Sequence, residues 1–384
     1  MARPHPTLID LAAGRPPRLV GDPEPLLQSA FEHRMNGLLW RSVQRGQLEV
    51  SDDVRRKLAM ESVHTEMRHT GIWDALTGAV GRLAAAGIEV ATFKGVAAER
   101  RWYEGVGDRP CWDVDLLLAP HQLDRAREAV ELIHPGHDMV ATIQDLARGN
   151  HAQGITLAFG TTEIDLHFDL FKFGYPGRQP DVIWERTVPL TLDDGSSIRV
   201  LDPEVSLVHF LYHLNRDKFK RLLGYADIAR VLSDQSLDRG YVHAFVAAEG
   251  LSTQFAMALR AVTETLELPD EGVRIPAGWR AAVWRLAWRP DTRLLGINAE
   301  ARYLRRGELL LPALVAGRGS DAIRYWFRRL LPAKAAADFK HPHAKGPYLW
   351  RLISGRIGQR WRRWRIRTAL GRSAKRAKGP SGVA

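Results

Sequence analysis

The feature that most constrains this chain is a short apolar segment that carries two aspartates, Trp112-Asp113-Val114-Asp115-Leu116. In a β-strand, residues two apart project from the same face, so Asp113 and Asp115 would lie together while Val114 and Leu116 face the core. Two neighbouring carboxylates on a half-buried strand repel each other, and a divalent cation such as Mg²⁺ removes that repulsion. The pair therefore indicates a metal site, although two ordinary aspartates on a solvated strand edge give the same pattern.

A second segment, TEIDLHF, has the same alternation further along the chain. Glu163, Asp165 and His167 would lie on one face of a strand, with apolar residues on the other. If this strand pairs beside the first, Asp165 can reach Asp113 and Asp115. Three carboxylates on adjacent strands could hold two cations about 4 Å apart, the arrangement that supports phosphoryl or nucleotidyl transfer. The alternative is that Glu163 and Asp165 simply face water on an amphipathic strand.

An anion-binding pattern precedes the aspartates. Lys94-Gly95 closes an apolar strand and opens a helix, and such a junction offers free backbone N–H groups and a positive charge to a phosphate. Arg109, four residues before Asp113, could also contact a phosphate. The alternatives are a plain turn at Lys94-Gly95, and an Arg109 that is exposed or paired with Asp108.

The periodicity of apolar residues predicts an α+β fold, with a small mixed sheet between two helical regions. The predicted regions are an N-terminal helical region at 1–83, an α/β core at 84–200, a C-terminal helical region at 201–331, and a linker with a basic tail at 332–384. Strands are predicted at 88–93, 112–118, 154–159 and 162–168, the last two as a hairpin joined at Gly160. Helices are predicted at 24–39, 52–83, 96–103, 122–133, 205–215, 219–232 and 241–266, with more over 277–331.

The formal net charge of +11 resides almost entirely in the tail. Residues 355–384 contain ten basic and no acidic residues, which leaves 45 basic and 44 acidic residues in the remainder. Residues 348–378 have the pattern of a basic amphipathic helix with tryptophans on its apolar face. This segment could pack on the core with its charges solvated, bind a polyanion such as RNA, or contact an anionic membrane surface.

Other features narrow the class of protein. Cys111 is the single cysteine, so an intramolecular disulfide and a multi-thiolate zinc site are excluded. No apolar run is long enough for a transmembrane segment and no signal peptide is evident, so a cytoplasmic protein is expected. His209 and His213 are four residues apart on a predicted helix but lack a third ligand, and we expect core or surface histidines there.

Taken together, the motifs resemble those of the uncharacterised nucleotidyltransferase family, part of the DNA polymerase β-like nucleotidyltransferase superfamily. The resemblance rests on Lys94-Gly95, Arg109-Pro110, Asp113-x-Asp115 and Asp165-x-His167, and it extends over about residues 20–330. Two positions differ from the usual pattern. The wider superfamily has Gly-Gly or Gly-Ser where this chain has Lys94-Gly95, and the third acid, commonly Glu in the family, is Asp165 here.

The resemblance implies an enzyme that binds a nucleotide such as ATP and transfers a nucleoside monophosphate from an NTP to an acceptor, with release of pyrophosphate. Asp113, Asp115 and Asp165 would bind Mg²⁺, or Mn²⁺ in its place, and Asp165 would help to deprotonate the acceptor hydroxyl. Lys94 and Gly95 would hold the triphosphate, with Arg109 as a further phosphate contact. The acceptor is not defined by the sequence.

Two other functions fit the same residues. The chain could be a non-catalytic protein of this fold that binds a polyanion or a membrane surface through residues 348–378. It could also be a phosphotransferase that moves only the terminal phosphate, because the same metal site would serve that reaction.

Overall fold

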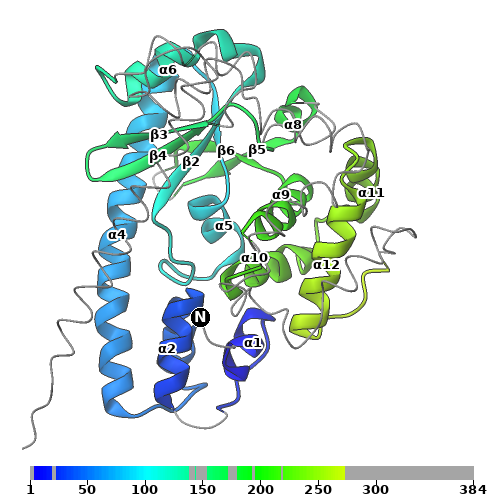
Figure 1. Cartoon of the computed structure of the whole chain (residues 1–384). Coiled ribbons are helices and arrows are strands. Elements are labelled where there is room, and N and C mark those ends of the chain that lie inside the picture. Colours follow the sequence, from blue (N-terminus) through cyan, green and yellow to red (C-terminus); the bar gives the residue numbers. More distant parts are fainter. Residues whose placement is uncertain are drawn as a thin grey trace, which may run out of the picture. The chain divides into compact units, whose positions relative to one another are not determined.

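The computed structural model of the chain describes residues 4–19, 23–137, 143, 154–171, 180–192, 195–217 and 219–272. Within this part, helices surround a six-stranded mixed sheet of strand order β3-β4-β2-β1-β6-β5 (Figure 1). The predicted α+β fold with a small mixed sheet is confirmed.

The sheet places strands from distant parts of the sequence side by side. Its strands are β1 Val90–Thr92, β2 Asp113–Leu118, β3 Gly154–Phe159, β4 Thr162–His167, β5 Thr187–Thr191 and β6 Ser197–Leu201. The pairs β2/β4 and β1/β6 are parallel, whereas β1/β2, β3/β4 and β5/β6 are antiparallel. The central strand β2 is therefore flanked by β1, which leads to Lys94, and by β4, which carries the second group of polar residues.

The four strands predicted from the sequence are present, and the predicted hairpin β3–β4 turns at Gly160 with a φ of +59°. The hairpin β5–β6 was not predicted. Pro189 interrupts the β5 pattern and cannot donate a backbone hydrogen bond, so it argues against a strand in the sequence. β5 lies at the edge of the sheet, where a missing donor is tolerated.

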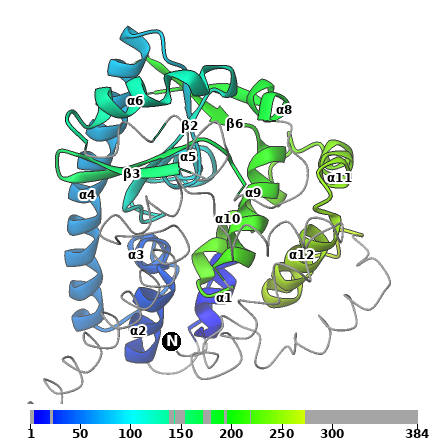
Figure 2. The same cartoon turned by 45° about the horizontal axis from the view of Figure 1, so that its top comes forward.

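The long helix α4, Asp52–Ala85, lies against both the sheet and the N-terminal helices (Figures 1 and 2). It begins at an N-cap, where the Ser51 side chain accepts a hydrogen bond from the Val54 amide. The chain reverses at Gly87, which has a φ of +68°. One face of α4 is buried, and it includes His69.

The N-terminal helices differ from the single predicted stripe over 24–39. That segment forms α2, Pro23–His33, and α3, Asn36–Gln44, and it breaks at Arg34, whose φ is +58°. A further helix, α1 Pro6–Ala12, precedes them and was not predicted. The break matters because it places the Arg34 side chain between two helix ends instead of on a helix face.

Two helical segments of the sheet region lie close to their predicted places. They are α5 Gly95–Trp102, and the 3₁₀ segment Pro120–Arg125 followed by α6 Ala126–Ile133. The predicted helix at 122–133 therefore begins with 3₁₀ geometry, after Pro120 has ended β2. The short helix α8, Pro180–Glu185, was not predicted.

Four helices follow the sheet, and they supply much of the apolar core. They are α9 Pro203–Arg216, α10 Leu222–Leu232, α11 Arg239–Ala248 and α12 Ser252–Leu266. The run predicted at 241–266 is two helices, because the chain turns at Gly250 with a φ of +67°. The fully buried ring of Phe93, at the end of β1, packs edge-on against His167 and His209. This contact joins the C-terminal helices to the strands that carry the polar residues.

Other predictions lie outside the described residues. These are the helices over 277–331, and the linker and basic tail at 332–384. Among the residues described, no helix combines the length and the apolar run needed to cross a membrane.

The turn between α11 and α12 buries a carboxylate without a partner. Glu249 is 1% exposed, and within the described part of the chain neither of its carboxylate oxygens has a hydrogen-bond partner. Burial raises the pKa of Glu249 to about 7, and the nearby charge of Asp169 adds to the effect. At neutral and higher pH the folded protein must therefore hold an unfavourable charge.

We expect Glu249→Gln to stabilise the protein at alkaline pH. The ordinary pKa is 4.5, so the folded protein retains a proton that the unfolded chain has lost, and wild-type stability falls between pH 4.5 and about 7. The variant should equal wild type at pH 4 and exceed it at pH 8 by on the order of 1–3 kcal/mol. Urea unfolding at both pH values measures the difference, with the exposed Glu89→Gln as a control. A pH-independent difference would contradict the assignment.

Candidate active site

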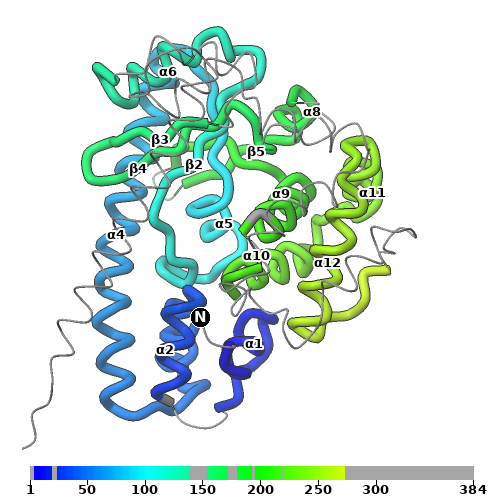
Figure 3. The backbone as a smooth tube through the Cα atoms, viewed as in Figure 1, coloured from blue at the N-terminus to red at the C-terminus, as the bar shows by residue number. Residues whose placement is uncertain are grey.

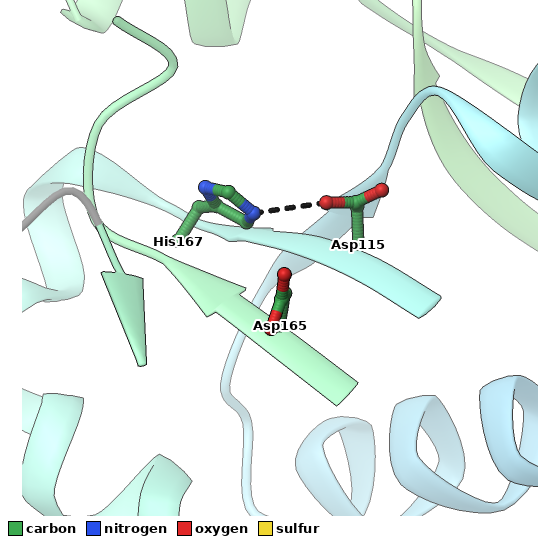
Figure 4. Close-up of side chains that lie close together, drawn as sticks. All are labelled: Asp115, Asp165 and His167. Atoms are coloured by element: carbon green, nitrogen blue, oxygen red, sulfur yellow. Dashed lines mark hydrogen bonds and ion pairs between the residues drawn. The ribbon is translucent and has the colours of Figure 1, made fainter. Parts of the chain in front are cut away.

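The polar residues of β2 and β4 converge on one face of the sheet. In the parallel register of these strands, Asp115 lies opposite Asp165. The ligand atoms of Asp115, Asp165 and His167 all lie within 4.8 Å of one another (Figure 4). Such a group of two carboxylates and an imidazole could hold a metal ion.

Asp115 is the centre of this group. It is 4% exposed, and its Oδ1 accepts hydrogen bonds from Lys94 Nζ at 2.6 Å and from His167 Nε2 at 3.0 Å. Burial alone would raise the pKa of Asp115, but the charge of Lys94 and the hydrogen bond from His167 outweigh burial and hold it well below its usual range. Asp115 is therefore ionised throughout the physiological pH range.

The other two predicted acids lie at the edge of this group. Asp165 is partly exposed, and its Oδ1 accepts a hydrogen bond from Thr156 Oγ1 at 2.5 Å. Asp113 is half-buried, and burial together with the charges of Asp115 and Asp165 raises its pKa. The local excess of negative charge is thus only partly compensated by Lys94. Glu163, opposite Asp113, is exposed.

Lys94 and Gly95 form the junction between β1 and α5. Lys94 has a φ of +57°, a conformation that costs a non-glycine residue of order 1–3 kcal/mol. Gly95 begins α5 and is buried, with Cys111 and the Asp113 carbonyl beside it. The strained backbone directs the lysine ammonium to Asp115.

A buried hydrogen-bond chain fixes the loop that joins α5 to β2, a loop that extends toward α2 (Figure 3). Glu99 accepts from the Gly107 amide at 2.8 Å and from His69 Nδ1 at 2.9 Å. His69 Nε2 in turn accepts from the Cys111 amide at 3.1 Å. Because Nδ1 donates its proton to Glu99 while the Nε2 lone pair accepts from the Cys111 amide, His69 is the Nδ1–H tautomer. These hydrogen bonds hold the loop at Gly107 and at Cys111, directly before Asp113.

The same loop carries Arg109, which is anchored to α10. Arg109 donates to both carboxylate oxygens of Asp227, each at 2.8 Å, and the Tyr103 hydroxyl donates to the same carboxylate at 2.6 Å. Burial alone would lower the pKa of Arg109, but Asp227 raises it well above its usual value. The alternative pairing of Arg109 with Asp108 is wrong, because Asp108 binds Arg41 at 2.9 Å.

Next to Lys94 is an open pocket with a basic lining. We call it the phosphate-sized pocket, and it is lined by Arg34, Lys94, Arg109, Phe210, His213, Leu214, Asp217, Arg221, Leu223, Gly224 and Asp227. Within the described part of the chain, neither Arg34 nor Arg221 forms an ion pair with a carboxylate; Arg34 stacks on Trp112 at 3.7 Å. Burial lowers the pKa of Arg34 to about 10, and the charge of Arg221 contributes.

Sequence reasoning missed several of these contacts. Arg34 is not part of any sequence motif. It reaches the pocket because the chain breaks between α2 and α3. His167 was noted for its alternation but not as a partner of Asp115. His209 is buried among aromatic rings, as expected for a core histidine, and the pKa of the Cys111 thiol is raised to about 12 by burial.

The Arg109–Asp227 pair yields a stability prediction. Asp227→Asn leaves the buried guanidinium without its counter-charge, so we expect a loss of about 3 kcal/mol in the free energy of unfolding. Asp217→Asn, which alters a more exposed carboxylate beside His213, should cost less than about 1 kcal/mol. Urea denaturation compares the two variants. Equal losses would contradict a tight buried pair.

Comparison with known proteins extends this picture. No curated protein sequence matches the chain. A solved structure, the crystal structure of an antigenic nucleotidyltransferase-like protein from Paracoccidioides brasiliensis, is 16% identical over 52% of this chain and 95% of that chain, with a TM-score of 0.28. The sequence profile of the uncharacterised nucleotidyltransferase family matches residues 21–267, well over half of the chain. The chain therefore belongs to the uncharacterised nucleotidyltransferase family.

Proposed function

We propose that the protein is a metal-dependent nucleotidyltransferase that transfers a nucleoside monophosphate from an NTP to an acceptor hydroxyl. The observation that carries the proposal is the position of Asp115 opposite Asp165 on β2 and β4, together with the hydrogen bond from Lys94 to the Asp115 carboxylate. Family membership supports the reaction class. The acceptor oxygen forms a bond to the α-phosphorus, and pyrophosphate leaves.

The donor set suits a divalent cation. Asp113, Asp115 and Asp165 would supply hard oxygen ligands. Burial, together with the charges of Asp115 and Asp165, raises the pKa of Asp113, and a bound cation would oppose that effect. His167 extends the set with a nitrogen, although its Nε2 is engaged with Asp115. Mg²⁺, or Mn²⁺ in its place, would neutralise charge on the phosphates when bound.

Each protein group has a proposed task in the transfer. Asp165 is partly exposed, whereas Asp115 is buried, and Asp165 would accept the proton of the acceptor hydroxyl. Lys94 lies between Asp115 and the phosphate-sized pocket, so its ammonium would hold the phosphates close to the acids. The Gly95 amide, at the start of α5, would donate to a phosphate oxygen.

Arg34 and Arg221 would complete the grip on the triphosphate. Both line the phosphate-sized pocket, and the charge of Arg221 contributes to the lowered pKa of Arg34, as expected for two positive charges that lie close together. Neither guanidinium has a carboxylate ion-pair partner among the residues that the structure describes, and each can donate two parallel hydrogen bonds to phosphate oxygens. Arg109 would contribute positive charge to the pocket without binding the phosphates directly, since its guanidinium is held by Asp227.

The acid cluster gives the central test. We expect Asp165→Asn to lower metal-dependent pyrophosphate release by at least about 100-fold, because charge at the reacting oxygen is lost. Glu163→Gln is the matched control, since it lies on the same strand but is exposed, and it should retain activity. The assay uses each labelled NTP with Mg²⁺ or Mn²⁺ and a panel of hydroxyl acceptors.

The other outcomes of this assay are equally informative. Full activity of Asp165→Asn would refute the role of that residue. Release of a nucleoside diphosphate instead of pyrophosphate would indicate transfer of the terminal phosphate. Absence of both turnover and metal-dependent nucleotide binding would overturn the proposed function and favour a non-catalytic protein.

Arg34 and Arg221 yield a separate prediction. Arg34→Gln and Arg221→Gln should each weaken NTP binding about tenfold, equivalent to 1.4 kcal/mol, through loss of charge-assisted hydrogen bonds. Equilibrium binding of a non-hydrolysable NTP with Mg²⁺ measures the effect. Arg55→Gln, on the exposed side of α4, is the control. Unchanged affinity in both variants would place the triphosphate elsewhere.

A further inference from the structure

A second basic cavity lies outside the proposed active site. It is bounded by the segment after α1, by α3, by the end of α5 and by α10, and its volume is about 240 Å³. Four arginines line it, and we call it the four-arginine pocket: Arg15, Arg41, Arg45 and Arg230. Trp102 and Tyr103 add aromatic side chains to the lining.

Three of the four arginines are paired with carboxylates. Arg15 binds Asp10 at 3.0 Å, Arg41 binds Asp108 at 2.9 Å, and Arg45 binds Glu104. The pairs differ in depth, because the Asp108 side chain is 5% exposed whereas that of Glu104 is 68% exposed. An exposed pair contributes at most about 1 kcal/mol, so a ligand anion can replace Glu104 at Arg45 with little loss.

Arg230 lacks a carboxylate partner among the residues described. Its guanidinium lies 4.3 Å from the centroid of the Tyr103 ring, and it donates to the backbone carbonyl oxygens of Ala226 and Ala12. Among the residues described, the Arg230 guanidinium on α10 thus lacks a carboxylate partner, and the Arg45 guanidinium at the end of α3 has only the exposed Glu104. A ligand with several linked anionic groups could satisfy both.

We propose that the four-arginine pocket binds an oligophosphate, either free or as part of a nucleotide. Guanidinium groups recognise phosphate oxygens through paired hydrogen bonds, and two such groups on different helices fit a chain of linked phosphates. This site does not depend on the proposed transfer reaction, since none of its lining residues belongs to the acid cluster.

The pocket also has a direct physical connection to the active site. Tyr103 lines the four-arginine pocket, and its hydroxyl binds Asp227, which in turn holds Arg109 at the phosphate-sized pocket. Asp108, at the other side of the pocket, lies on the same loop as Arg109. An anion bound here therefore contacts the groups that position Arg109, so the site is placed to regulate substrate binding.

The test is calorimetric titration of the full-length protein with inorganic tripolyphosphate in EDTA. Two variants remove equal charge from the two basic cavities, namely Arg45→Gln/Arg230→Gln and Arg34→Gln/Arg221→Gln. We expect the first to lose one binding event, or to weaken it at least tenfold, and the second to retain that event. Arg45→Gln alone, a change at an exposed side chain, should weaken it about threefold while the fold is unaffected.

A change of opposite sign sharpens the test. Glu104→Gln removes the acid that competes for Arg45 and should tighten tripolyphosphate binding several-fold, whereas Glu128→Gln, which breaks the remote Arg125–Glu128 pair, should leave it unchanged. Tighter binding of ATP than of tripolyphosphate would identify a nucleotide as the ligand, and equal binding would identify a free oligophosphate. Binding that is lost only in Arg34→Gln/Arg221→Gln, or weakened equally by both double variants, would overturn the proposal.

Discussion

The candidate active site depends on the parallel register of β2 and β4. Because side chains alternate along a strand, a shift of one residue in either strand would turn Asp115 or Asp165 to the apolar face. The register is secured by the opposite faces of the same strands, where Val114, Leu116 and Ile164 are fully buried. The apolar core thus determines which polar atoms meet, and the repulsion among the acids is imposed by packing on that other face.

The positively charged side chains near these acids lie outside the strands, and other contacts fix their positions. Lys94 is held at a strained junction, and the loop that precedes β2 is held by the buried chain of Glu99 and His69. That loop joins the Arg41–Asp108 and Arg109–Asp227 pairs, which lead to α3 and α10 respectively. One ten-residue connection therefore relates both helical regions to the acids.

The alternation of polar and apolar residues was sufficient to predict the four strands that carry and support the site, because a two-residue period has one structural meaning. It was also sufficient to indicate that Asp113, Asp115, Asp165 and His167 share a face. It was insufficient for partners that depend on tertiary contacts. The link of Arg109 to Asp227 spans 118 residues, and the place of Arg34 follows from a helix break that the apolar stripe conceals. Edge strand β5 was missed because Pro189 is unfavourable in most strands but acceptable at an open edge.

The two sides of the phosphate-sized pocket differ in how stiffly they are connected to the acids. Helix α4 is 34 residues long, about 50 Å at the usual rise per residue, and it contacts α2 and α3 as well as β2 and β4. Arg34 lies between α2 and α3, so its position relative to the acids depends on the packing of these helices and strands on α4, one continuous helix that resists bending. Arg221 instead follows a turn between α9 and α10, in which Phe219 has a φ of +55°. One side of the pocket is thus tied to the acids through a long regular helix, and the other through α10 and its contact with Arg109.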